Sequence, residues 1–584
     1  MSDPIHAPSE QRSPASALGP EQRQVAWERL GSEQFDVVVI GGGVVGSGCA
    51  LDAATRGLKV ALVEARDFAS GTSSRSSKMF HGGLRYLEQL EFGLVREALY
   101  ERELSLTKLA PHLVRPMPFL FPLTHRVWER PYTAAGIFLY DRLGGAKSVP
   151  AQKHLTRAGA LRLSPGLKRT SLIGGIRYYD TVVDDARHTM TVARTAAHYG
   201  AVVRSSTQVV ALLREGDRVT GVRVRDSEDG AITEVRGHVV VNATGVWTDE
   251  IQALSKQRGR FQVRASKGVH VVVPRDRIVS DVAIILRTEK SVMFVIPWGS
   301  HWIIGTTDTD WNLDLAHPAA TKADIDYILG TVNTVLATPL THADIDGVYA
   351  GLRPLLAGES EETSKLSREH AVAVPAPGLV AIAGGKYTTY RVMAADAIDA
   401  AAQFVPARVA PSITEKVTLL GADGYFALVN QAEHVAALKG LHPYRVRHLL
   451  DRYGSLVGDV LALGDDEPGL LSPIKEAPGY LKVEARYAVT AEGALHLEDI
   501  LARRTRISIE YPHRGVDCVR EVADVVAPAL GWTAADIDRE VANYSARVEA
   551  EILSQAQPDD VSADELRASA PEPRAELLEP VPLS

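Results

Sequence analysis

The sequence predicts an α/β fold in which a βαβ unit is followed by an antiparallel sheet and then by a mostly helical region. Three patterns support this prediction. Short apolar runs bounded by glycine-rich turns begin near residue 35, and residues 261–307 alternate between apolar and polar side chains. Beyond about residue 410, helix-like segments dominate. The chain has 584 residues, which is enough for several domains.

The βαβ unit comes first. Phe35–Ile40 is an apolar run rich in valine, which is typical of a buried strand. Val44–Arg56 follows as a helix, and Gly57 ends it because glycine tolerates the left-handed conformation at a helix C-terminus. Val60–Val63 is a second apolar strand. The unit therefore places a helix N-terminus directly after a strand and a glycine-rich turn.

The glycines of this turn have the spacing G-x-G-x-x-G, with Gly41, Gly43 and Gly46 at the three positions. Such glycines let the backbone approach a pyrophosphate, and the helix N-terminus adds amide donors and a positive dipole. Glu64 lies 18 residues after Gly46, at the end of the second strand, where a carboxylate can accept the hydrogen bonds of an adenosine ribose. Arg66 suits a 2′-phosphate, but Glu64 would repel one. The unit is therefore a predicted dinucleotide site.

The later elements continue the mixed pattern. The expected strands and helices are Ile173–Tyr179 (strand), Asp185–Tyr199 (helix), Val209–Leu213 (strand), Val239–Asn242 (strand), Leu379–Ala383 (strand), about 388–404 (helix), Arg445–Tyr453 (helix) and Ala534–Ile552 (helix). Gly216-Asp217 separates two β-rich runs and has the composition of a hairpin turn. The alternation in residues 261–307 predicts an antiparallel sheet, with no helices between its strands.

Two buried strands far along the chain end in short turns. Val239–Asn242 leads into Ala243-Thr244-Gly245, and Leu379–Ala383 leads into Gly384-Gly385-Lys386 before a helix. FAD is a long molecule, and its flavin end needs backbone contacts remote from the first βαβ unit. A helix N-terminus near residues 385–389 would also stabilise negative charge on a reduced flavin ring. These turns favour FAD over NAD as the dinucleotide.

Composition and charge limit the function and the surroundings of the protein. The net charge is −8, and residues 558–584 hold seven acids and two bases, so the rest of the chain is nearly neutral. We therefore expect no nucleic-acid partner. Two cysteines are too few for a disulfide framework or a cysteine-based zinc cluster, so we expect a reduced compartment and no metal site. We expect no membrane-spanning segment and no targeting peptide.

Both ends of the chain have biased compositions. Residues 1–31 are rich in Pro, Ser, Ala and Gln, and residues 556–584 combine prolines with excess acid. Neither stretch has a sustained apolar period, so a flexible arm and an acidic tail are predicted.

Several unlinked motifs closely resemble the FAD-dependent, aerobic-type glycerol-3-phosphate dehydrogenases. They are Gly71-Thr72-Ser73-Ser74-Arg75-Ser76-Ser77-Lys78, His81-Gly82-Gly83-Leu84-Arg85-Tyr86-Leu87, Gly351-Leu352-Arg353-Pro354-Leu355, Gly384-Gly385-Lys386-Tyr387-Thr388-Thr389-Tyr390-Arg391 and Ala502-Arg503-Arg504-Thr505-Arg506. The resemblance covers about residues 33–550. It implies an FAD-binding Rossmann-like domain of the D-amino-acid-oxidase/glutathione-reductase type, an antiparallel-sheet substrate domain and a helical C-terminal domain.

The resemblance also implies domain limits. The oxidoreductase domain would span 32–405, with FAD-binding parts at about 32–112, 172–258 and 352–402. The substrate-binding parts would lie at about 113–171 and 259–351, and the helical domain at 406–555.

The activity that the resemblance implies is oxidation of sn-glycerol 3-phosphate to dihydroxyacetone phosphate. A hydride would pass from substrate C2 to flavin N5, and the electrons would go on to a quinone. Three alternatives stay open: an oxidase that uses oxygen, an amine flavoenzyme of the D-amino-acid-oxidase type, and an FAD-bearing binding or regulatory protein without turnover.

Site residues are carried over from the family motifs. The implied catalytic residues are His270, Arg353, Arg85 and Lys386, and the implied substrate-binding residues are Arg85, Tyr86, His270, Arg353, Arg368 and Lys386. Arginine suits the substrate because its planar fork binds a phosphate dianion through charge-assisted hydrogen bonds. His270 is the candidate proton acceptor, because neutral imidazole accepts protons near pH 7, and its other interpretation is a hydrogen-bonded histidine within the sheet.

The family motifs also imply a set of cofactor contacts beyond Gly41, Gly43, Gly46 and Glu64. They are Thr72, Ser73, Ser76, Ser77, Gly82, Val209, Ala243, Thr244, Gly245, Gly385, Lys386 and Thr388. The FAD is expected to bind non-covalently, since no cysteine lies near Lys386.

Aromatic residues gather in Met117–Arg142. They are Phe119, Phe121, Trp128, Tyr132, Phe138 and Tyr140, accompanied by Arg126, Arg130 and Arg142. Aromatic rings with basic residues suit a membrane interface, and members of the family dock on a membrane to reach quinone. The alternative is an ordinary wall of the substrate domain. The expected location is the cytoplasm, with peripheral attachment to the inner face of the cell membrane. The C-terminal helices could pair two subunits in a homodimer.

Overall fold

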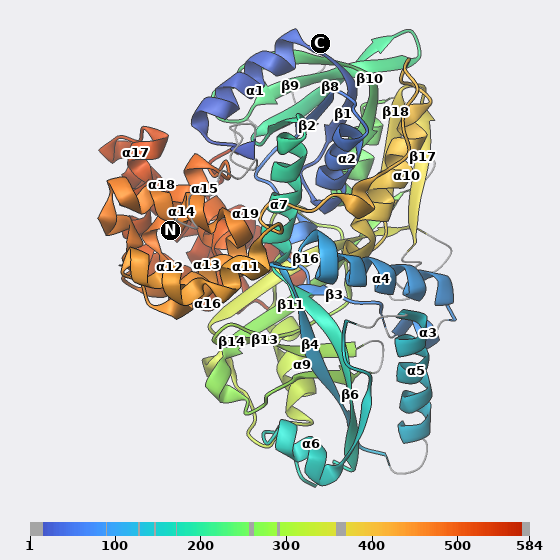
Figure 1. Ribbon diagram of the computed structural model, residues 1–584, viewed down its shortest axis with the longest axis vertical. Coiled ribbons are helices and arrows are strands. Elements are labelled where there is room, and N and C mark those ends of the chain that lie inside the picture. Colours follow the sequence, from blue (N-terminus) through green and yellow to red (C-terminus); the bar gives the residue numbers. More distant parts are fainter. Residues whose placement is uncertain are drawn as a thin grey trace.

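The structure is a computed structural model. It describes residues 16–83, 85–88, 90–125, 129–144, 148–170, 172–255, 262–288, 292–357 and 369–574, without the side chains of Arg85 and Glu88. Figure 1 shows three regions: a sheet with helices at the top, a second sheet below it, and a group of helices on one side. The predicted α/β fold class with a helical C-terminal region is confirmed.

The upper sheet has eight strands, with the path β17-β18-β10-β1-β2-β7 and with β9 joining β10 to β8. Its strands are β1 (Gln34–Ile40), β2 (Val60–Val63), β7 (Val202–Arg204), β8 (Thr207–Glu215), β9 (Arg218–Asp226), β10 (Ile232–Asn242), β17 (His370–Ala376) and β18 (Leu379–Gly384). The five strands from β18 to β7 run parallel. Every residue of β2 is buried, because helices cover both faces of this parallel core.

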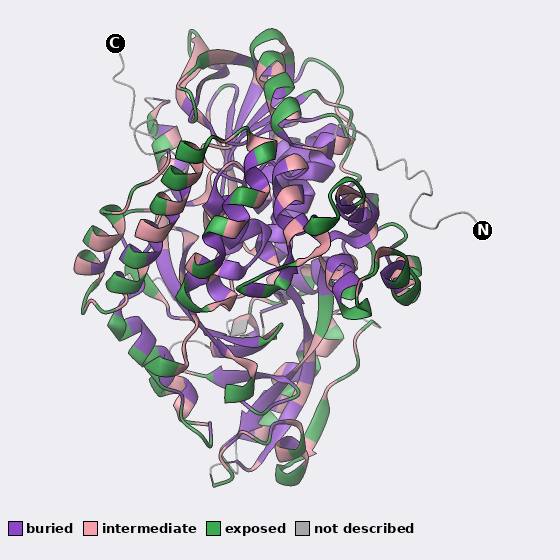
Figure 2. Cartoon of the chain, turned by 90° about the vertical axis from the view of Figure 1, so that its left-hand side faces the viewer, coloured by how far each residue is buried: buried purple, intermediate pink, exposed green. Residues whose placement is uncertain are grey.

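Alternate residues of β1 point to opposite faces of this sheet. Val37 and Val39 pack with the helices α2 (Val44–Thr55), α7 (Asp185–His198) and α10 (Tyr390–Ala402). Phe35 and Val38 belong to a second core on the other face, together with α1 (Pro20–Ser32). Figure 2 shows the strands and inner helix faces as buried and the outer helix faces as exposed.

The lower sheet has ten strands, and only the β12–β4 pair is parallel. Its strands are β3 (Met79–Phe80), β4 (Val114–Leu123), β5 (Lys153–Thr156), β6 (Gly174–Val183), β11 (Val263–Pro274), β12 (Ala283–Arg287), β13 (Val292–Trp298), β14 (His301–Gly305), β15 (Thr309–Trp311) and β16 (Gly347–Leu356). The alternation in residues 261–307 thus predicted the antiparallel strands β11–β14 correctly for their described residues, which have the spatial order β11-β14-β13-β12.

Helices α3 (Arg85–Glu88), α4 (Phe92–Leu104), α5 (Glu129–Gly144), α6 (Arg157–Leu163), α8 (Thr248–Ala253) and α9 (Lys322–Asn333) accompany the two sheets. The C-terminal region is built from α11 (Tyr425–Asn430), α12 (Ala432–Lys439), α13 (Pro443–Tyr453), α14 (Val457–Asp466), α15 (Lys482–Thr490), α16 (Ile507–Glu510), α17 (Val519–Leu530) and α18 (Ala534–Ser554), with a hairpin of β19 (Pro473–Ile474) and β20 (Ala477–Leu481). Two apolar clusters form its core. Among the described residues, no helix has the length and apolar character needed to cross a membrane.

The predicted flexible arm is wrong for its described part. Pro20–Ser32 form helix α1, with Ala26 and Leu30 buried against the upper sheet. Arg23 donates to the Ser205 carbonyl at 2.6 Å and pairs with Asp226 at 2.9 Å. Only two apolar side chains of the helix are buried, so no apolar period is visible in the sequence. Residues 1–15 lie outside the described part.

The tail is acidic, but the expectation that it lies outside the folded body is wrong for its described part. Asp560–Ala568 form helix α19, with Ala563 fully buried and Asp560 paired with Lys267 of β11. Arg574 is buried and donates to Ser206 at 2.9 Å and Asp499 at 3.1 Å. The tail is ordered by ion pairs with distant parts of the chain, which no local sequence pattern reveals. Residues 575–584 lie outside the described part.

The aromatic segment divides between core and surface. Phe119, Phe121 and Tyr140 are buried in the core of the lower sheet, so the membrane interpretation is wrong for these three rings. Tyr132 and Phe138 lie exposed on α5, while Trp128 and Arg126 fall outside the described residues. The sequence alone could not separate the two groups, because the buried Tyr140 and the exposed Tyr132 and Phe138 lie on the same helix, α5.

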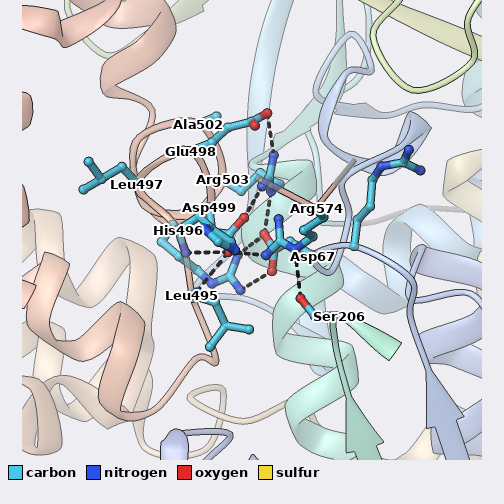
Figure 3. A network of polar contacts seen from close by, with 12 residues as sticks. Asp67, Ser206, Leu495, His496, Leu497, Glu498, Asp499, Ala502, Arg503 and Arg574 are labelled. Carbon is cyan, nitrogen blue, oxygen red and sulfur yellow. Dashed lines mark hydrogen bonds and ion pairs between the residues drawn. The ribbon is translucent and has the colours of Figure 1, made fainter. Parts of the chain in front are cut away.

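Buried ion pairs join the C-terminal helices to the upper sheet. Asp67, which follows β2, accepts hydrogen bonds from Arg503 at 2.5 Å and from Arg504 at 2.7 and 2.8 Å. Figure 3 shows Arg503 between Asp67 and Asp499. Arg574, from the tail, donates to the Asp499 carboxylate as well. Since each of these charges is buried, removing one partner would leave an uncompensated charge.

His496 makes this interface sensitive to pH. Its ring lies between Glu540, 2.9 Å from Nδ1, and Glu228, 3.0 Å from Nε2. Burial and Arg574 lower its pKa, but the bonds to the two glutamates outweigh them and raise the pKa to about 9. A raised histidine pKa contributes stability that is complete below about pH 6.5 and is lost as the pH rises through about 9.

We therefore expect the melting temperature of the wild type to fall between pH 7 and pH 10 by more than that of His496→Gln. The linked free energy is about 3 kcal/mol. His513→Gln is the matched control, because His513 is 73% exposed beside Asp517. If the melting temperatures of wild type and His496→Gln fell equally between pH 7 and pH 10, the imidazolium would not stabilise the interface.

Candidate active site

A cavity of about 580 Å³ lies where the carboxyl ends of the parallel strands meet the lower sheet. Its wall includes Gly41 and Glu64 beside the upper sheet, His270 and Arg353 of the lower sheet, and Lys386 after β18. Ligands of open α/β sheets bind at this edge, and the volume is typical of small-molecule and cofactor sites. The predicted site residues from widely separated motifs therefore share one cavity.

The glycine turn forms one end of the cavity. Gly41 has φ of 108°, which favours glycine, and a Cβ on Gly46 would lie 1.9 Å from the Gly41 carbonyl oxygen. Helix α2 could not begin at this point with any larger residue at position 46. The Val44 amide donates to Ser73 Oγ at 3.0 Å, so the Ser-rich loop is held against the first turn of α2.

Glu64 is fixed beside this turn. Its two carboxylate oxygens accept the amides of Gly42 at 2.6 Å and Arg66 at 2.8 Å. Burial raises the pKa of the Glu64 carboxyl, and the two amides and the Arg66 charge offset part of that rise. The carboxylate thus orders the backbone around the predicted ribose position.

His270 lies on β11 at the opposite end of the cavity. Its Nε2 is 2.9 Å from Ser77 Oγ, and its ring stacks on Tyr349 with centroids 4.7 Å apart. Burial, followed by the charges of Arg353 and Lys78, holds the pKa of His270 well below its usual value. The imidazole is therefore neutral at pH 7 and able to accept a proton.

Arg353 lies on β16, opposite Ser266 of β11. Its Nη2 donates to Thr306 Oγ1 at 3.1 Å and to the Thr307 carbonyl at 3.2 Å, and its side chain is 25% exposed. A Cβ on Gly268 would lie 2.6 Å from that nitrogen, so glycine makes room for the guanidinium. The guanidinium reaches the same end of the cavity as His270.

Lys386 follows two glycines with left-handed φ, Gly384 at 78° and Gly385 at 76°. A Cβ on Gly385 would lie 2.4 Å from Met393 Sδ. The turn brings Lys386 Nζ to 3.6 Å from the centre of the Tyr86 ring, a cation–π contact. Three predicted side chains with different chemistry, the two cations and the imidazole, thus line the same cavity.

Most of the predicted site residues line the cavity wall. They are Gly41, Gly43, Glu64, Thr72, Ser73, Ser76, Ser77, Tyr86, Val209, Ala243, Thr244, Gly245, His270, Arg353, Gly385, Lys386 and Thr388. Gly46 and Gly82 lie behind the wall. A Cβ on Gly82 would lie 2.6 Å from Leu99, so packing requires this glycine. The backbone of Arg85 lies in α3 without a described side chain, and Arg368 lies outside the described residues.

Sequence reasoning missed several residues that shape the site. Lys78 is fully buried, pairs with Asp185 at 2.9 Å and lies 4.9 Å from the Tyr349 ring on which His270 stacks. Trp247 lines the cavity and meets Arg66 at 5.8 Å. Lys78 stands within the quoted Ser-rich motif, but only its complete burial distinguishes it from an exposed lysine.

Fold and site together define an FAD-dependent oxidoreductase. Residues 36–391 match the model of the family described as FAD dependent oxidoreductase, and residues 412–537 match the C-terminal domain of alpha-glycerophosphate oxidase. The first match covers more than half of the chain, so the protein belongs to the FAD-dependent oxidoreductases.

Similar proteins identify the family within the FAD-dependent oxidoreductases. The chain is 90% identical to "Glycerol-3-phosphate dehydrogenase 2" of Mycobacterium tuberculosis over 584 residues, with 100% of both chains covered. It is 36% identical to the human mitochondrial glycerol-3-phosphate dehydrogenase over 530 residues, covering 86% of this chain and 71% of that protein. The structure of the Bacillus halodurans glycerol-3-phosphate dehydrogenase complexed with FAD matches with a TM-score of 0.75 and 29% identity, over 93% of this chain and 99% of that one. This protein is a member of the glycerol-3-phosphate dehydrogenase family.

FAD is the cofactor of this family member, and the site fits it. The glycine turn and the Glu64 carboxylate suit the adenosine diphosphate half. The cavity extends without interruption to the glycines before α10, whose N-terminal end suits the flavin half. When bound, FAD would be held by the Gly41–Gly43 backbone, Glu64 and the residues from Gly384 to Thr388.

We expect Glu64→Ala to weaken FAD binding by about 10- to 100-fold, because it removes a ribose acceptor and releases the amides of Gly42 and Arg66. Flavin titration of the apoprotein measures the effect, with the ratio of flavin to protein absorbance after gel filtration as a second readout. Glu234→Ala is the control, since Glu234 is 37% exposed on β10. If Glu64→Ala bound FAD as tightly as Glu234→Ala, Glu64 would not contribute to the cofactor site.

Proposed function

We propose that this protein oxidises sn-glycerol 3-phosphate at C2 to dihydroxyacetone phosphate and delivers the electrons to a quinone. One observation carries the proposal: a neutral imidazole, a guanidinium and an ammonium group line the same cavity. A secondary alcohol that bears a phosphate needs these two kinds of group, a proton acceptor and cationic donors. The relatives named glycerol-3-phosphate dehydrogenase support the same substrate.

The cations would bind and orient the phosphate dianion. Hydrogen bonds to Thr306 and Thr307 hold the Arg353 guanidinium in place, so it is already positioned before the substrate binds. Lys386 is positioned by the Tyr86 ring. A substrate without the phosphate would make no charge-assisted hydrogen bonds to these two cations, which gives selectivity against glycerol.

His270 would remove the proton of the C2 hydroxyl. Its Nε2 lies 2.9 Å from Ser77 Oγ, and both His270 and Ser77 line the wall of the cavity. Tyr349 fixes the plane of the ring by stacking. Bound FAD supplies the hydride acceptor, N5 of its ring.

Turnover assays separate the proposal from its rivals. With glycerol 3-phosphate, a soluble quinone should support faster turnover than oxygen, with little peroxide formed. Turnover with oxygen that equals or exceeds turnover with quinone would favour the oxidase. Turnover with glycine or a D-amino acid and none with glycerol 3-phosphate would favour the amine flavoenzyme.

We also propose that the enzyme works in the cytoplasm, attached peripherally to the inner face of the cell membrane. The outer face of α5 presents Tyr132, Phe138 and Leu139, which are 48%, 53% and 37% exposed, and Arg142 stacks on Phe138 at 5.0 Å. Leu90 and Phe92 near α4 are exposed as well. Apolar rings with adjacent arginines favour the interface of an anionic membrane.

The double variant Tyr132→Ser/Phe138→Ser should weaken binding to anionic lipid vesicles about 10-fold or more, because two aromatic rings no longer enter the interface. Vesicle flotation measures this, and activity with a soluble acceptor should stay unchanged. The control is Tyr327→Ser/Phe426→Ser, since these rings are 48% and 62% exposed on other helices. If the two double variants floated equally with vesicles, α5 would not form the membrane contact.

A further inference from the structure

A second cavity of about 110 Å³ lies between β16 and the C-terminal helices. Six arginines line it: Arg75, Arg503, Arg506, Arg514, Arg547 and Arg567. Its only carboxylates are Glu498 and Glu551, and it shares only Arg75 with the cofactor cavity, among the described residues. We infer that this cavity binds a small oxyanion of the phosphate class, at a site separate from the substrate.

Two of the arginines are already neutralised from outside the cavity. Arg503 pairs with Asp67 and Asp499, and Arg506 with Asp184 and Asp185. Four arginines then face Glu498 and Glu551.

Those four arginines keep an excess of positive charge. Arg547 pairs with Glu498 and reaches a third carboxylate, Glu572, at 3.1 Å. Arg514 and Arg567 share Glu551, at 3.2 and 3.3 Å. Arg75 has no carboxylate within 4.0 Å among the described side chains, and its Nη1 donates to the Ala316 carbonyl at 2.8 Å. An anion is the ligand that balances this wall.

Hydrogen-bond donors in the wall are also unsatisfied. Arg567 Nε and Gln555 Nε2 are buried and make no hydrogen bond to the described atoms, whereas Arg514 Nε has only its ion-pair contact with Glu551 at 3.2 Å. The Arg514 and Arg567 side chains are 6% and 10% exposed. A buried donor left unpaired costs about 1–3 kcal/mol. An oxyanion offers several acceptors and no donors, which complements this set, whereas water alone would leave the charge excess in place.

The backbone that positions Arg514 is unusual. His513, Arg514 and Gly515 have φ of 51°, 56° and 75° in succession. Left-handed conformation is uncommon for residues other than glycine, and clusters of it occur at ligand sites. The turn lets Arg514 donate to the Asp346 carbonyl at 2.6 Å while its guanidinium forms part of the wall.

The volume of the cavity and the burial of its arginines limit the kind of ligand that fits. A cavity of about 110 Å³ has room for a phosphate-sized group and not for a nucleotide. Burial, the largest cause, lowers the pKa of Arg75 to about 10 and lowers that of Arg567, so a bound anion would offset the cost of burying both charges. Arg75 also lines the cofactor cavity, which gives the two sites a shared side chain.

Equilibrium dialysis of the holoenzyme with radiolabelled inorganic phosphate tests the inference, with chloride keeping the ionic strength constant. Arg567→Gln should lower phosphate affinity at least about 10-fold, and Arg514→Gln should act in the same direction. Arg539→Gln is the matched control, because Arg539 is 60% exposed on α18. Flavin content and melting temperature in chloride establish that each variant is folded.

A third variant, Arg353→Gln, separates the two cavities, because it removes a cation of the substrate region and should retain the phosphate site. Equal phosphate affinity in Arg567→Gln and Arg539→Gln would overturn the inference. Loss of all phosphate binding in Arg353→Gln would overturn it too, because the cofactor cavity would then account for the ion. Dialysis requires no turnover, so the result does not depend on the proposed reaction.

Discussion

Arg353→Gln is expected to lower kcat/KM for glycerol 3-phosphate by about 10²–10³-fold while FAD stays bound. The guanidinium is held by Thr306 and Thr307 at the end of the cavity where the substrate phosphate would lie. Glutamine keeps one neutral donor and loses the charge, so most of the loss should appear as a higher KM. Steady-state kinetics with a soluble quinone acceptor measure it.

Selectivity gives this prediction a second readout. The preference for glycerol 3-phosphate over glycerol should shrink in Arg353→Gln, because only the phosphorylated substrate uses the clamp. Arg353→Lys should recover part of the preference, since it restores the charge without the fork. Arg264→Gln is the control, because Arg264 lies on the neighbouring strand β11 and pairs with Asp310 near the surface. An unchanged preference in Arg353→Gln would show that another group binds the phosphate.

His270→Gln is expected to lower kcat by about 10²–10⁴-fold, the range for loss of a general base. Glutamine approximates the size of the ring and cannot accept the proton, so FAD binding should persist and KM should change little. The neutral state of the wild-type imidazole follows from its burial and from the charges of Arg353 and Lys78.

Chemical rescue distinguishes a base from a packing residue. Added imidazole should restore part of the activity of His270→Ala and none of that of Arg353→Gln. His301→Gln is the control, since His301 is a buried histidine on the adjacent strand β14, beside Asp346. If the activity of His270→Gln were within about threefold of that of His301→Gln, His270 would be a packing residue of the sheet, and another group would be the base.

The elements that local pattern determines could be predicted from the sequence. The strand Val60–Val63 agrees with β2 at both ends, and Val44–Arg56 exceeds α2 by one residue. These segments carry a dense apolar pattern between glycines. The turns after β10 and β18 were predicted for the same reason, and they bring Thr244 and Lys386 to one cavity.

What escaped prediction depends on contacts between distant residues. Helix α19 is held by Lys267 and the Arg574 region by Asp499, so the acidic composition of the tail was misleading. Asp67 is buried because Arg503 and Arg504 arrive from the far end of the chain. The same holds for the arginine-lined cavity, since Arg75 belongs to an N-terminal loop and Arg567 to the last helix. No local window contains both partners of such a pair.

Anaerobic mixing of the holoenzyme with glycerol 3-phosphate shows whether this substrate reduces the flavin, with flavin absorbance followed near about 450 nm. We expect rapid loss of this absorbance, slow loss in His270→Gln and no response to glycerol or D-amino acids. Absorbance that persists with glycerol 3-phosphate, or that disappears with glycine or a D-amino acid instead, would contradict the proposed reaction.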